Sequence, residues 1–273
     1  MQSVDESKRS TVSAVLIIKN EAAYIERALN SLLWCDEIIV VDSLSTDDTP
    51  RICQDPSAPW AKKIRFFEQE WLGFSAQRNL ANSKAVCDWI FTIDGDEACS
   101  PELRNKIQSI VSDPESHRQG VQYKIRNQEY FLGRPIHYGI WNPSYHVRMY
   151  PRGALKFTGT VHEGIDSQCT QTIQIDEPIH HVENLQIERF LNKLNLYTTL
   201  QAKSDYESGM RTNFARILLS FPAMFYKNYI YYRSYLDGKE GFIISVLEGI
   251  SRTVRHLKIW QLERLAEKTK ETL

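Results

Sequence analysis

Residues 89–97 read Trp-Ile-Phe-Thr-Ile-Asp-Gly-Asp-Glu, an uncharged run that stops at an acidic cluster. The uncharged residues are mostly β-branched or aromatic, which is typical of a buried strand. Asp94 and Asp96 lie two residues apart, so in an extended chain they share a face, and Gly95 permits close approach to the backbone. Carboxylates at the carboxyl end of a strand are candidate ligands for a hard divalent cation, Mg²⁺ or Mn²⁺. The alternative is a solvated acidic turn after a core strand.

Runs rich in apolar residues alternate with helical patterns through the first part of the chain. This alternation predicts an α/β fold with a mostly parallel, Rossmann-like sheet. The carboxyl ends of parallel strands meet at one edge, so the polar clusters that follow these strands should lie together. The predicted strands are residues 12–18, 37–41, 63–67 and 89–93, and the predicted helices begin near residues 20, 49 and 73.

The chain changes character after this alternating part. Short β-like pieces at 121–125, 145–150 and 172–175 are separated by Gly, Pro and Asn turns, which predicts an antiparallel section added to the sheet. Beyond these pieces the pattern is helical. We therefore expect a first domain over residues 1–183 and a helical C-terminal extension over residues 184–273.

Composition and charge restrict the function classes. The chain has 273 residues, 42% of them hydrophobic, and a formal net charge of −1, so no global charge points to nucleic acid. The five cysteines are irregularly spaced and lack a C-x-x-C pair, which argues against zinc and disulfide frameworks and for a reducing, cytoplasmic setting. Residues 1–11 are polar, so we expect no signal peptide. The longest apolar stretch near the C-terminus, residues 217–226, is shorter than the ~20 residues of a spanning helix.

Four motifs in order resemble the family 2 glycosyltransferases, which have the GT-A fold. They are VSAVLIIKNEAAYIERALNSL, EIIVVDSLSTDDT, GFSAQRNLA and WIFTIDGDE, all before residue 100. The chain also resembles a subgroup that includes the lipopolysaccharide inner-core β-1,4-glucosyltransferases of Gram-negative bacteria, in RMYPRGALKFTGTVHEGI and HHVENLQIERFLNKLNLYTTLQA. The resemblance implies a nucleotide-binding half over residues 12–100 and an acceptor half over residues 101–183.

The resemblance assigns the nucleotide to the ends of the first two strands. The matching residues are Asn20, Glu21 and Asp42, whose oxygens would accept hydrogen bonds from uracil N3–H and the ribose hydroxyls. Asn20 could instead be only a helix N-cap, and Asp42 only a turn former. Lys19 stands where many family members carry a small or hydroxyl residue.

The metal and the donor diphosphate are assigned by resemblance to the D-x-D motif and a nearby arginine. Asp96 is the implied metal ligand, and Asp94 lies near the ribose, or near the metal through water. Arg78 would lie near the diphosphate, close to a helix start whose free N–H groups favour anions. A solvated helix-face arginine is the alternative for Arg78. We expect Glu97 behind these residues or facing solvent.

The motif Val-His-Glu supplies the implied base of an inverting transfer. Glu163 matches it and would take the proton of the acceptor hydroxyl as that oxygen attacks the anomeric carbon. The alternative is that Glu163 pairs with an arginine such as Arg148 and only shapes the pocket. His162 could orient Glu163. His180 or His181 could supply a further metal contact, and we assign this role to His181.

The resemblance implies transfer of a hexose, glucose in the first instance, from a UDP-sugar to a lipid-linked saccharide of the lipopolysaccharide inner core. Mg²⁺ or Mn²⁺ is the implied cofactor. Trp141 and Tyr145 could stack on the acceptor sugar or pack in the core. Rival interpretations are transfer to another surface glycan, such as capsule or exopolysaccharide, and a catalytically silent nucleotide-binding protein. A haloacid-dehalogenase-type phosphatase is disfavoured, because its nucleophilic Asp would lie nearer the chain start.

The C-terminal third has the pattern of a segment that docks on a membrane surface. Apolar residues recur there and cations lie among them, as an amphipathic helix on anionic head groups requires. We expect a peripheral protein on the inner face of the bacterial inner membrane; packing of the same residues on the first domain is the alternative. The apolar set is Leu218, Leu219, Phe221, Met224, Phe225, Tyr229, Tyr231, Tyr232, Ile243, Val246, Leu247, Ile250, Val254 and Leu257, and the cations are Arg211, Arg216, Lys227, Arg233, Arg252, Arg255 and Lys258.

Overall fold

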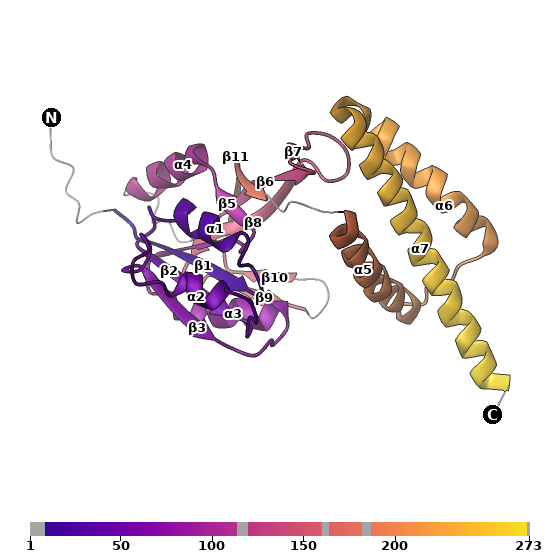
Figure 1. Ribbon diagram of the computed structural model, residues 1–273, viewed down its shortest axis with the longest axis horizontal. Helices are drawn as coiled ribbons and strands as arrows, with labels where there is room; N and C mark the ends of the chain where they lie inside the picture. Colours follow the sequence, from indigo (N-terminus) through magenta and orange to yellow (C-terminus); the bar gives the residue numbers. More distant parts are fainter. Residues whose placement is uncertain (1–8, 114–119, 160–163, 182–186, 272–273) are drawn as a thin grey trace. The chain divides into compact units, whose positions relative to one another are not determined.

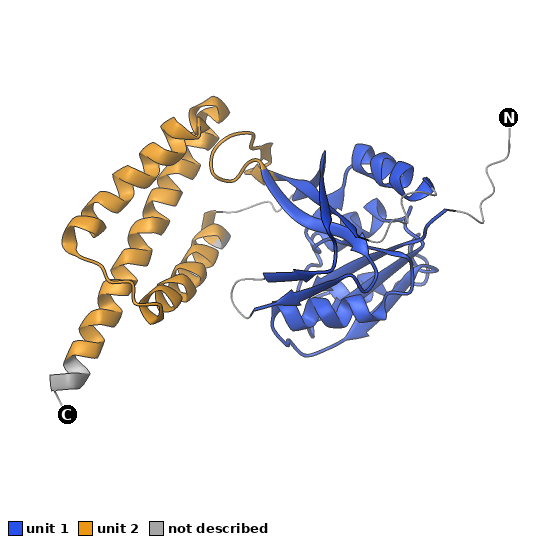
Figure 2. Ribbon diagram, turned by 180° about the vertical axis from the view of Figure 1, so that it is seen from behind, with its two compact units in different colours: residues 1–128, 144–183 blue, residues 129–143, 184–273 orange. Residues whose placement is uncertain are grey.

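The chain folds into two compact units (Figure 2). Unit 1 comprises residues 1–128 and 144–183, and unit 2 comprises residues 129–143 and 184–273. The segment 129–143, part of the acceptor half in the sequence analysis, groups with the C-terminal helices. The computed structural model describes residues 9–113, 120–159, 164–181 and 187–271.

Unit 1 is built on a mixed sheet (Figure 1). Its parallel strands are β1 (Val12–Ile18), β2 (Glu37–Asp42), β3 (Ile64–Glu68) and β4 (Trp89–Thr92), and its antiparallel strands are β5 (Glu97–Cys99), β6 (Val121–Phe131), β8 (Ser144–Pro151) and β11 (Gln171–His181). The strand order is β3–β2–β1–β4–β8–β6–β11–β5. The predicted parallel sheet with an antiparallel section is confirmed, and each predicted parallel strand is found within one residue of its expected bounds.

Helices cover both faces of the parallel part, because both faces of its strands are apolar. Leu16 belongs to one hydrophobic cluster with residues of α1 (Ile25–Ser31) and α4 (Pro101–Ser112). Its neighbour Val15 points to the opposite face and belongs to a second cluster with residues of α3 (Phe74–Lys84). The sheet is thus fixed from both sides, which leaves its carboxyl edge for polar residues.

Two of the three predicted helix starts are confirmed. α2 (Thr49–Cys53) begins where expected, with Pro50 in its first turn, and α3 begins directly after Gly73, whose φ of +90° favours glycine. The prediction that Asn20 caps the first helix is wrong. α1 begins only at Ile25, and Asn20 has a φ of +57° in the turn before it.

The described residues of unit 2 form three α-helices, a 3-10 turn η4 (Ser234–Asp237), and a short strand β7 (Arg134–Pro135) that pairs with the end of β6. The helices are α5 (Ile187–Glu207), α6 (Phe214–Tyr226) and α7 (Gly238–Glu271), and both α5 and α6 pack on α7. A π-helical turn, η3 (Lys227–Tyr231), directly follows α6. Within the described residues, every helix is too short or too polar to cross a membrane.

The segment 129–143 joins unit 2 through specific contacts. The Trp141 indole N–H donates to the Glu248 carboxylate at 2.8 Å, and its ring lies between Phe131 and Phe190. Trp141 therefore packs in a core, the second of the two roles open from the sequence. Tyr145, in unit 1, donates its hydroxyl to Asp176 at 2.7 Å.

Candidate active site

The carboxyl ends of β1, β2 and β4 meet at one edge of the sheet, as predicted. Ile18 at the end of β1 pairs with Asp42 at the end of β2, and β4 runs parallel on the other side of β1. The Glu21 side chain reaches Gly95 of the acidic cluster. A Cβ on Gly95 would lie 2.8 Å from Cγ of Glu21, too close for any other residue to replace glycine without movement. Glycine thus allows Glu21 to lie beside the D-x-D motif.

Asn20 and Asp42 organise the loop after β2. Asp42 is fully buried, and its carboxylate accepts hydrogen bonds from the N–H of Ser45 at 2.8 Å and from its hydroxyl at 2.5 Å. The Asn20 side-chain oxygen accepts from the N–H of Thr46 at 2.8 Å. In this conformation Asp42 forms a turn, the alternative that the sequence left open. The nucleotide contacts of Asn20, Glu21 and Asp42 stay predictions.

Asp94 lies between two guanidinium groups. Arg78 approaches one carboxylate oxygen at 3.1 Å, and Arg148 approaches the other at 3.3 Å. Burial raises the pKa of Asp94, but the charges of Arg78 and Arg148 outweigh it and hold that pKa below its usual range. The Arg78 side chain is 13% exposed and its guanidinium lies 5.6 Å from the Phe157 ring centre, so it is not a solvated helix-face arginine.

Arg148, named from the sequence only as a possible partner of Glu163, pairs with Asp94 and Glu97. It lies on β8, is buried, and approaches the Glu97 carboxylate at 2.6 Å. The same carboxylate accepts from the Asn127 side chain at 3.1 Å and from the N–H of Asp94 at 2.9 Å. Burial raises the pKa of Glu97 to about 7, with Arg148 opposing the shift and Asp94 adding to it. Glu97 is 3% exposed, so of its two expected positions the structure shows the one behind the site.

His181 reaches Asp96 from the far end of β11. The antiparallel pairing of β5 with β11 sets His181 opposite Glu97, and its Nε2 lies 3.1 Å from a carboxylate oxygen of Asp96. Adjacent residues of a strand point to opposite faces, so His180 is directed away from Asp96. The structure therefore distinguishes the two histidines, which the sequence could not.

The pair Asp96 and His181 fits a divalent cation that is shared with a ligand. In the part of the chain that the structure describes, no group of three or more His, Cys, Asp or Glu side chains could hold a metal ion. Mg²⁺ commonly takes only one or two protein ligands and completes its shell with substrate phosphates and water, and Mn²⁺ also accepts carboxylate oxygens. The donor set thus suits a metal–diphosphate complex better than a bare ion.

The predicted base Glu163 lies outside the described residues, as does His162. On the described side, β9 (Leu155–Thr158) leads to Gly159, whose carbonyl accepts from the Ser75 hydroxyl at 2.7 Å. Ser75 is on α3, one turn before Arg78. α3 therefore anchors the chain just before position 160, while the role of Glu163 stays a prediction.

Comparison with known proteins gives matches that agree with this geometry. Residues 13–176 match the family described as Glycosyl transferase family 2. An uncharacterized glycosyltransferase of Rickettsia felis is 31% identical over 91% of this chain and 89% of its own length. The lipopolysaccharide core biosynthesis glycosyltransferase LpsC of Rhizobium meliloti is 28% identical over 93% of each. The mannosyltransferase PcManGT from Pyrobaculum calidifontis, solved with GDP-Man and Mn²⁺, aligns with a TM-score of 0.55 and 14% identity over 94% of this chain and 89% of that one. This likeness confirms the predicted GT-A architecture.

Proposed function

Because the chain belongs to glycosyltransferase family 2, we propose that it transfers a hexose from a UDP-sugar, with inversion, to a lipid-linked saccharide. We propose glucose as the hexose and the lipopolysaccharide inner core as the acceptor. The core biosynthesis role printed for the Rhizobium relative supports this acceptor. The observation that carries the proposal is the sheet edge where Arg78 and Arg148 hold Asp94 while His181 meets Asp96.

We assign the donor to this edge. The N-terminal turn of α3 presents free N–H groups near Arg78, a setting that favours a diphosphate. Asp96 and His181 would hold a divalent ion, which when bound would offset the charge that develops on the departing UDP. The Mn²⁺ present with the mannosyltransferase neighbour is consistent with this assignment. We assign Asp94, which two arginines hold in place, to a position near the donor ribose, or near the metal through water.

We assign the acceptor step to Glu163. Its carboxylate would take the proton of the acceptor hydroxyl while the hydroxyl oxygen forms a bond to the anomeric carbon. The bond from that carbon to the diphosphate breaks on the opposite side, which inverts the configuration, and UDP leaves. The metal and the arginines would then act on the leaving-group side of the sugar, and the base would act on the opposite side, where the acceptor attacks.

We further propose that the protein works in the cytoplasm at the inner membrane surface, where a lipid-linked acceptor would lie. The two predicted stripes of unit 2 both have exposed members, and α7 also has buried ones; Ile250 and Leu257 of α7 are 37% and 44% exposed. On α7, Leu247 is 7% exposed and packs in a hydrophobic cluster, whereas Leu218 of α6 is 64% exposed. Leu247 packs with residues of unit 2 itself, so its burial is not the packing on the first domain that was the alternative. We assign α6 to the membrane.

A donor panel tests the proposed function. UDP release is measured from UDP-glucose, UDP-galactose and GDP-mannose, with Mn²⁺ or with EDTA, and with deacylated inner-core saccharide or an unrelated surface glycan as acceptor. We expect UDP-glucose with Mn²⁺ and the inner-core saccharide to be fastest. Transfer only to the unrelated glycan would favour the capsule or exopolysaccharide alternative. Donor binding without turnover of any donor would indicate a silent nucleotide-binding protein.

A further inference from the structure

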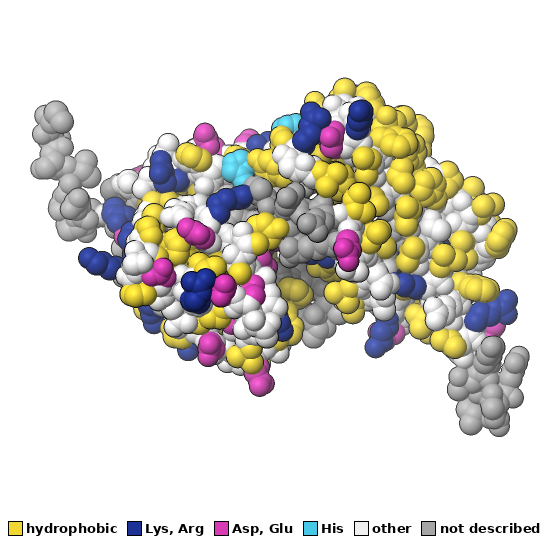
Figure 3. Space-filling model, viewed as in Figure 1, with side chains coloured by type: hydrophobic (Ala, Val, Ile, Leu, Met, Phe, Trp, Pro, Cys, Tyr) yellow, Lys and Arg dark blue, Asp and Glu magenta, His cyan; other side chains and the backbone are white. Residues whose placement is uncertain are grey.

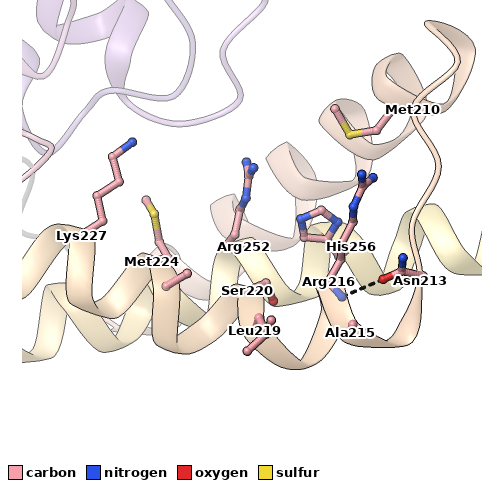
Figure 4. A pocket seen from close by; sticks show the side chains of 11 residues that line it. Met210, Asn213, Ala215, Arg216, Leu219, Ser220, Met224, Lys227, Arg252 and His256 are labelled. Atoms are coloured by element: carbon pink, nitrogen blue, oxygen red, sulfur yellow. Dashed lines mark hydrogen bonds between the residues drawn. The ribbon is translucent and has the colours of Figure 1, made fainter.

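A groove of about 680 Å³ runs between α6 and α7 and collects cations (Figure 4). Arg216 and Lys227 border it from the α6 side, and Arg252 borders it from α7. The three side chains extend to the same side of the helix pair (Figure 4). Eleven residues separate Arg216 from Lys227, about three helical turns, so both lie on one face of α6 and its continuation. The groove therefore carries a line of positive charge.

The charge in the groove is not neutralised by carboxylates of the described residues. No Asp or Glu is among the residues that line it, and no described carboxylate forms an ion pair with Arg216, Lys227 or Arg252. Arg216 donates instead to a backbone carbonyl at 2.7 Å, which leaves its charge uncompensated. The neighbouring Arg255 differs, because it is paired with Asp205.

A buried histidine lies among the same cations. His256 lines the groove and is 8% exposed. Burial, and then the charges of Arg252, Arg255 and Arg216, lower the pKa of His256, with Asp205 opposing them. The groove thus attracts an anion without help from a protonated His256.

Apolar side chains line part of the groove and are exposed elsewhere on unit 2. Hydrophobic side chains cover much of the visible face of the C-terminal helices (Figure 3). Phe214 is 79% exposed and Tyr231 is 71% exposed, at the two ends of the α6–η3 segment. Leu219 and Met224 continue this apolar character into the groove itself. Charge and apolar surface together suit a ligand that has both an anionic head and a hydrocarbon body.

We propose that the groove binds the phosphate head group of an anionic membrane phospholipid, while the exposed apolar side chains of α6 and η3 enter the surrounding head-group layer. The planar forks of Arg216 and Arg252 match phosphate oxygens, and Lys227 adds a point charge. A segment of acidic residues alone is a poorer fit, because it would leave apolar residues such as Leu219, which lines the groove and is 60% exposed, in water. This inference rests on the proposed function only in that a lipid-linked acceptor brings the protein to a membrane.

Vesicle co-sedimentation tests the proposal. The full chain is mixed with vesicles of phosphatidylcholine alone, or of phosphatidylcholine with phosphatidylglycerol, at low and high salt. We expect binding to the anionic vesicles that weakens as salt rises. The double variant Arg216→Gln, Arg252→Gln should bind about 25-fold more weakly, at roughly fivefold for each cation near an anionic surface.

A charge-matched variant controls for net charge. Arg51→Gln, Arg264→Gln removes two exposed arginines that already pair with Asp48 and Glu267, outside the groove. It should bind within about twofold of the wild type, because distant charges are screened. Equal loss in both double variants would show a non-specific charge effect and overturn the groove site. Circular dichroism of each variant checks that the helices are retained.

Two further measurements separate the possible occupants. Calorimetric titration compares dihexanoyl phosphatidylglycerol with inorganic phosphate, and equal affinity for both would overturn the lipid assignment in favour of a free anion site. Sedimentation velocity without vesicles would overturn it in favour of a second copy, if a dimer forms and the groove variant abolishes it.

UDP release is measured on the same preparation without vesicles. If the protein turns over UDP-glucose but does not bind anionic vesicles, the proposed lipid site in the groove is refuted and the proposed function is not. If it binds the vesicles through the groove but turns over no donor, the proposed function is refuted and the lipid site is not.

Discussion

Arg148 in unit 1 is buried and bonds to both Asp94 and Glu97, whereas Arg252 in unit 2 is exposed and pairs with none of the described carboxylates. A buried charge is tolerated only when it is paired, and Arg148 forms both of its ion pairs without a ligand. An exposed cation is solvated by water, so it is tolerated without a protein partner and can bind an external anion. The ion pairs of Arg148 thus hold the side chains of the site in place, whereas Arg252 is available to bind an anionic ligand.

The largest effect is expected from the D-x-D motif. Asp96→Asn removes the negative charge that would hold the metal, and we expect it to abolish transfer, as EDTA should in the wild type. The fold should survive, because Asp96 lies at a strand end. UDP release with UDP-glucose and Mn²⁺ measures the loss, and Asp55→Asn, in an exposed turn, is the matched control. Full turnover by Asp96→Asn without metal would rule out the metal assignment.

The acceptor base is the next target. Glu163→Gln should lower transfer by roughly 10²–10⁴-fold, the usual range for loss of a general base. Binding of UDP-glucose, measured by calorimetry, should barely change, because the base acts on the acceptor. Glu207→Gln, which removes an exposed carboxylate of α5, should leave both quantities unchanged. A large loss of donor affinity in Glu163→Gln would contradict the role.

Removal of Arg148 tests whether its ion pairs with Asp94 and Glu97 stabilise the fold. Arg148→Met leaves Asp94 and Glu97 without their shared partner and should lower the free energy of unfolding by about 3–5 kcal/mol. Urea denaturation measures this change. Arg148→Lys keeps the charge but not the fork, so it should lose less. A change below about 0.5 kcal/mol in Arg148→Met would show that the network does not stabilise the fold.

The ion pair between Arg148 and Asp94 predicts that the free energy of unfolding depends on pH. The arginines hold the pKa of Asp94 below its unfolded value, so its stabilisation is full above about pH 4 and is lost as the pH falls through the folded pKa. Wild-type protein should therefore lose more unfolding free energy than Arg148→Met between about pH 5 and pH 3. Parallel pH profiles of the two proteins would contradict the assignment of this loss to Asp94.

Substitution of the two histidines at the end of β11 should have different effects on transfer. His181→Gln should reduce transfer by about 10–100-fold and raise the Mn²⁺ concentration needed, since this is the usual cost of disturbing groups around a metal. His180→Gln, on the opposite face, should retain activity within a few-fold. Equal losses would mean that the contact between His181 and Asp96 plays no part in metal use.

The smallest effect is expected when Arg252, which has no carboxylate partner among the described residues, is replaced. Arg252→Met breaks no ion pair among the described residues, so its free energy of unfolding should stay within about 0.5 kcal/mol of the wild type. Urea denaturation beside Arg148→Met gives the direct contrast. A destabilisation as large as that of Arg148→Met would show that Arg252 is a structural residue.

Local pattern was enough to predict the parallel strands, because a strand that is covered on both faces needs a run of mostly apolar residues. Residues 12–18, and residues 38–41 after Glu37, are such runs, and the polar residues after them mark the shared edge. The turn at Asn20 was missed, because its left-handed backbone depends on a hydrogen bond to Thr46 across the loop. Arg148 left one local signal, a lone cation in the otherwise apolar end of a strand.

By itself, the sequence determined the α/β class, the sheet edge and the acidic pair, since each follows from residues close together in the chain. Only the tertiary structure decided that Arg148 and Arg78 share Asp94, since these three come from different elements. It also chose His181 over His180, because a one-residue change in the pairing of β5 with β11 would turn the other side chain toward Asp96. Register and long-range ion pairs are set by the packing of the whole sheet, and no short stretch of sequence contains them.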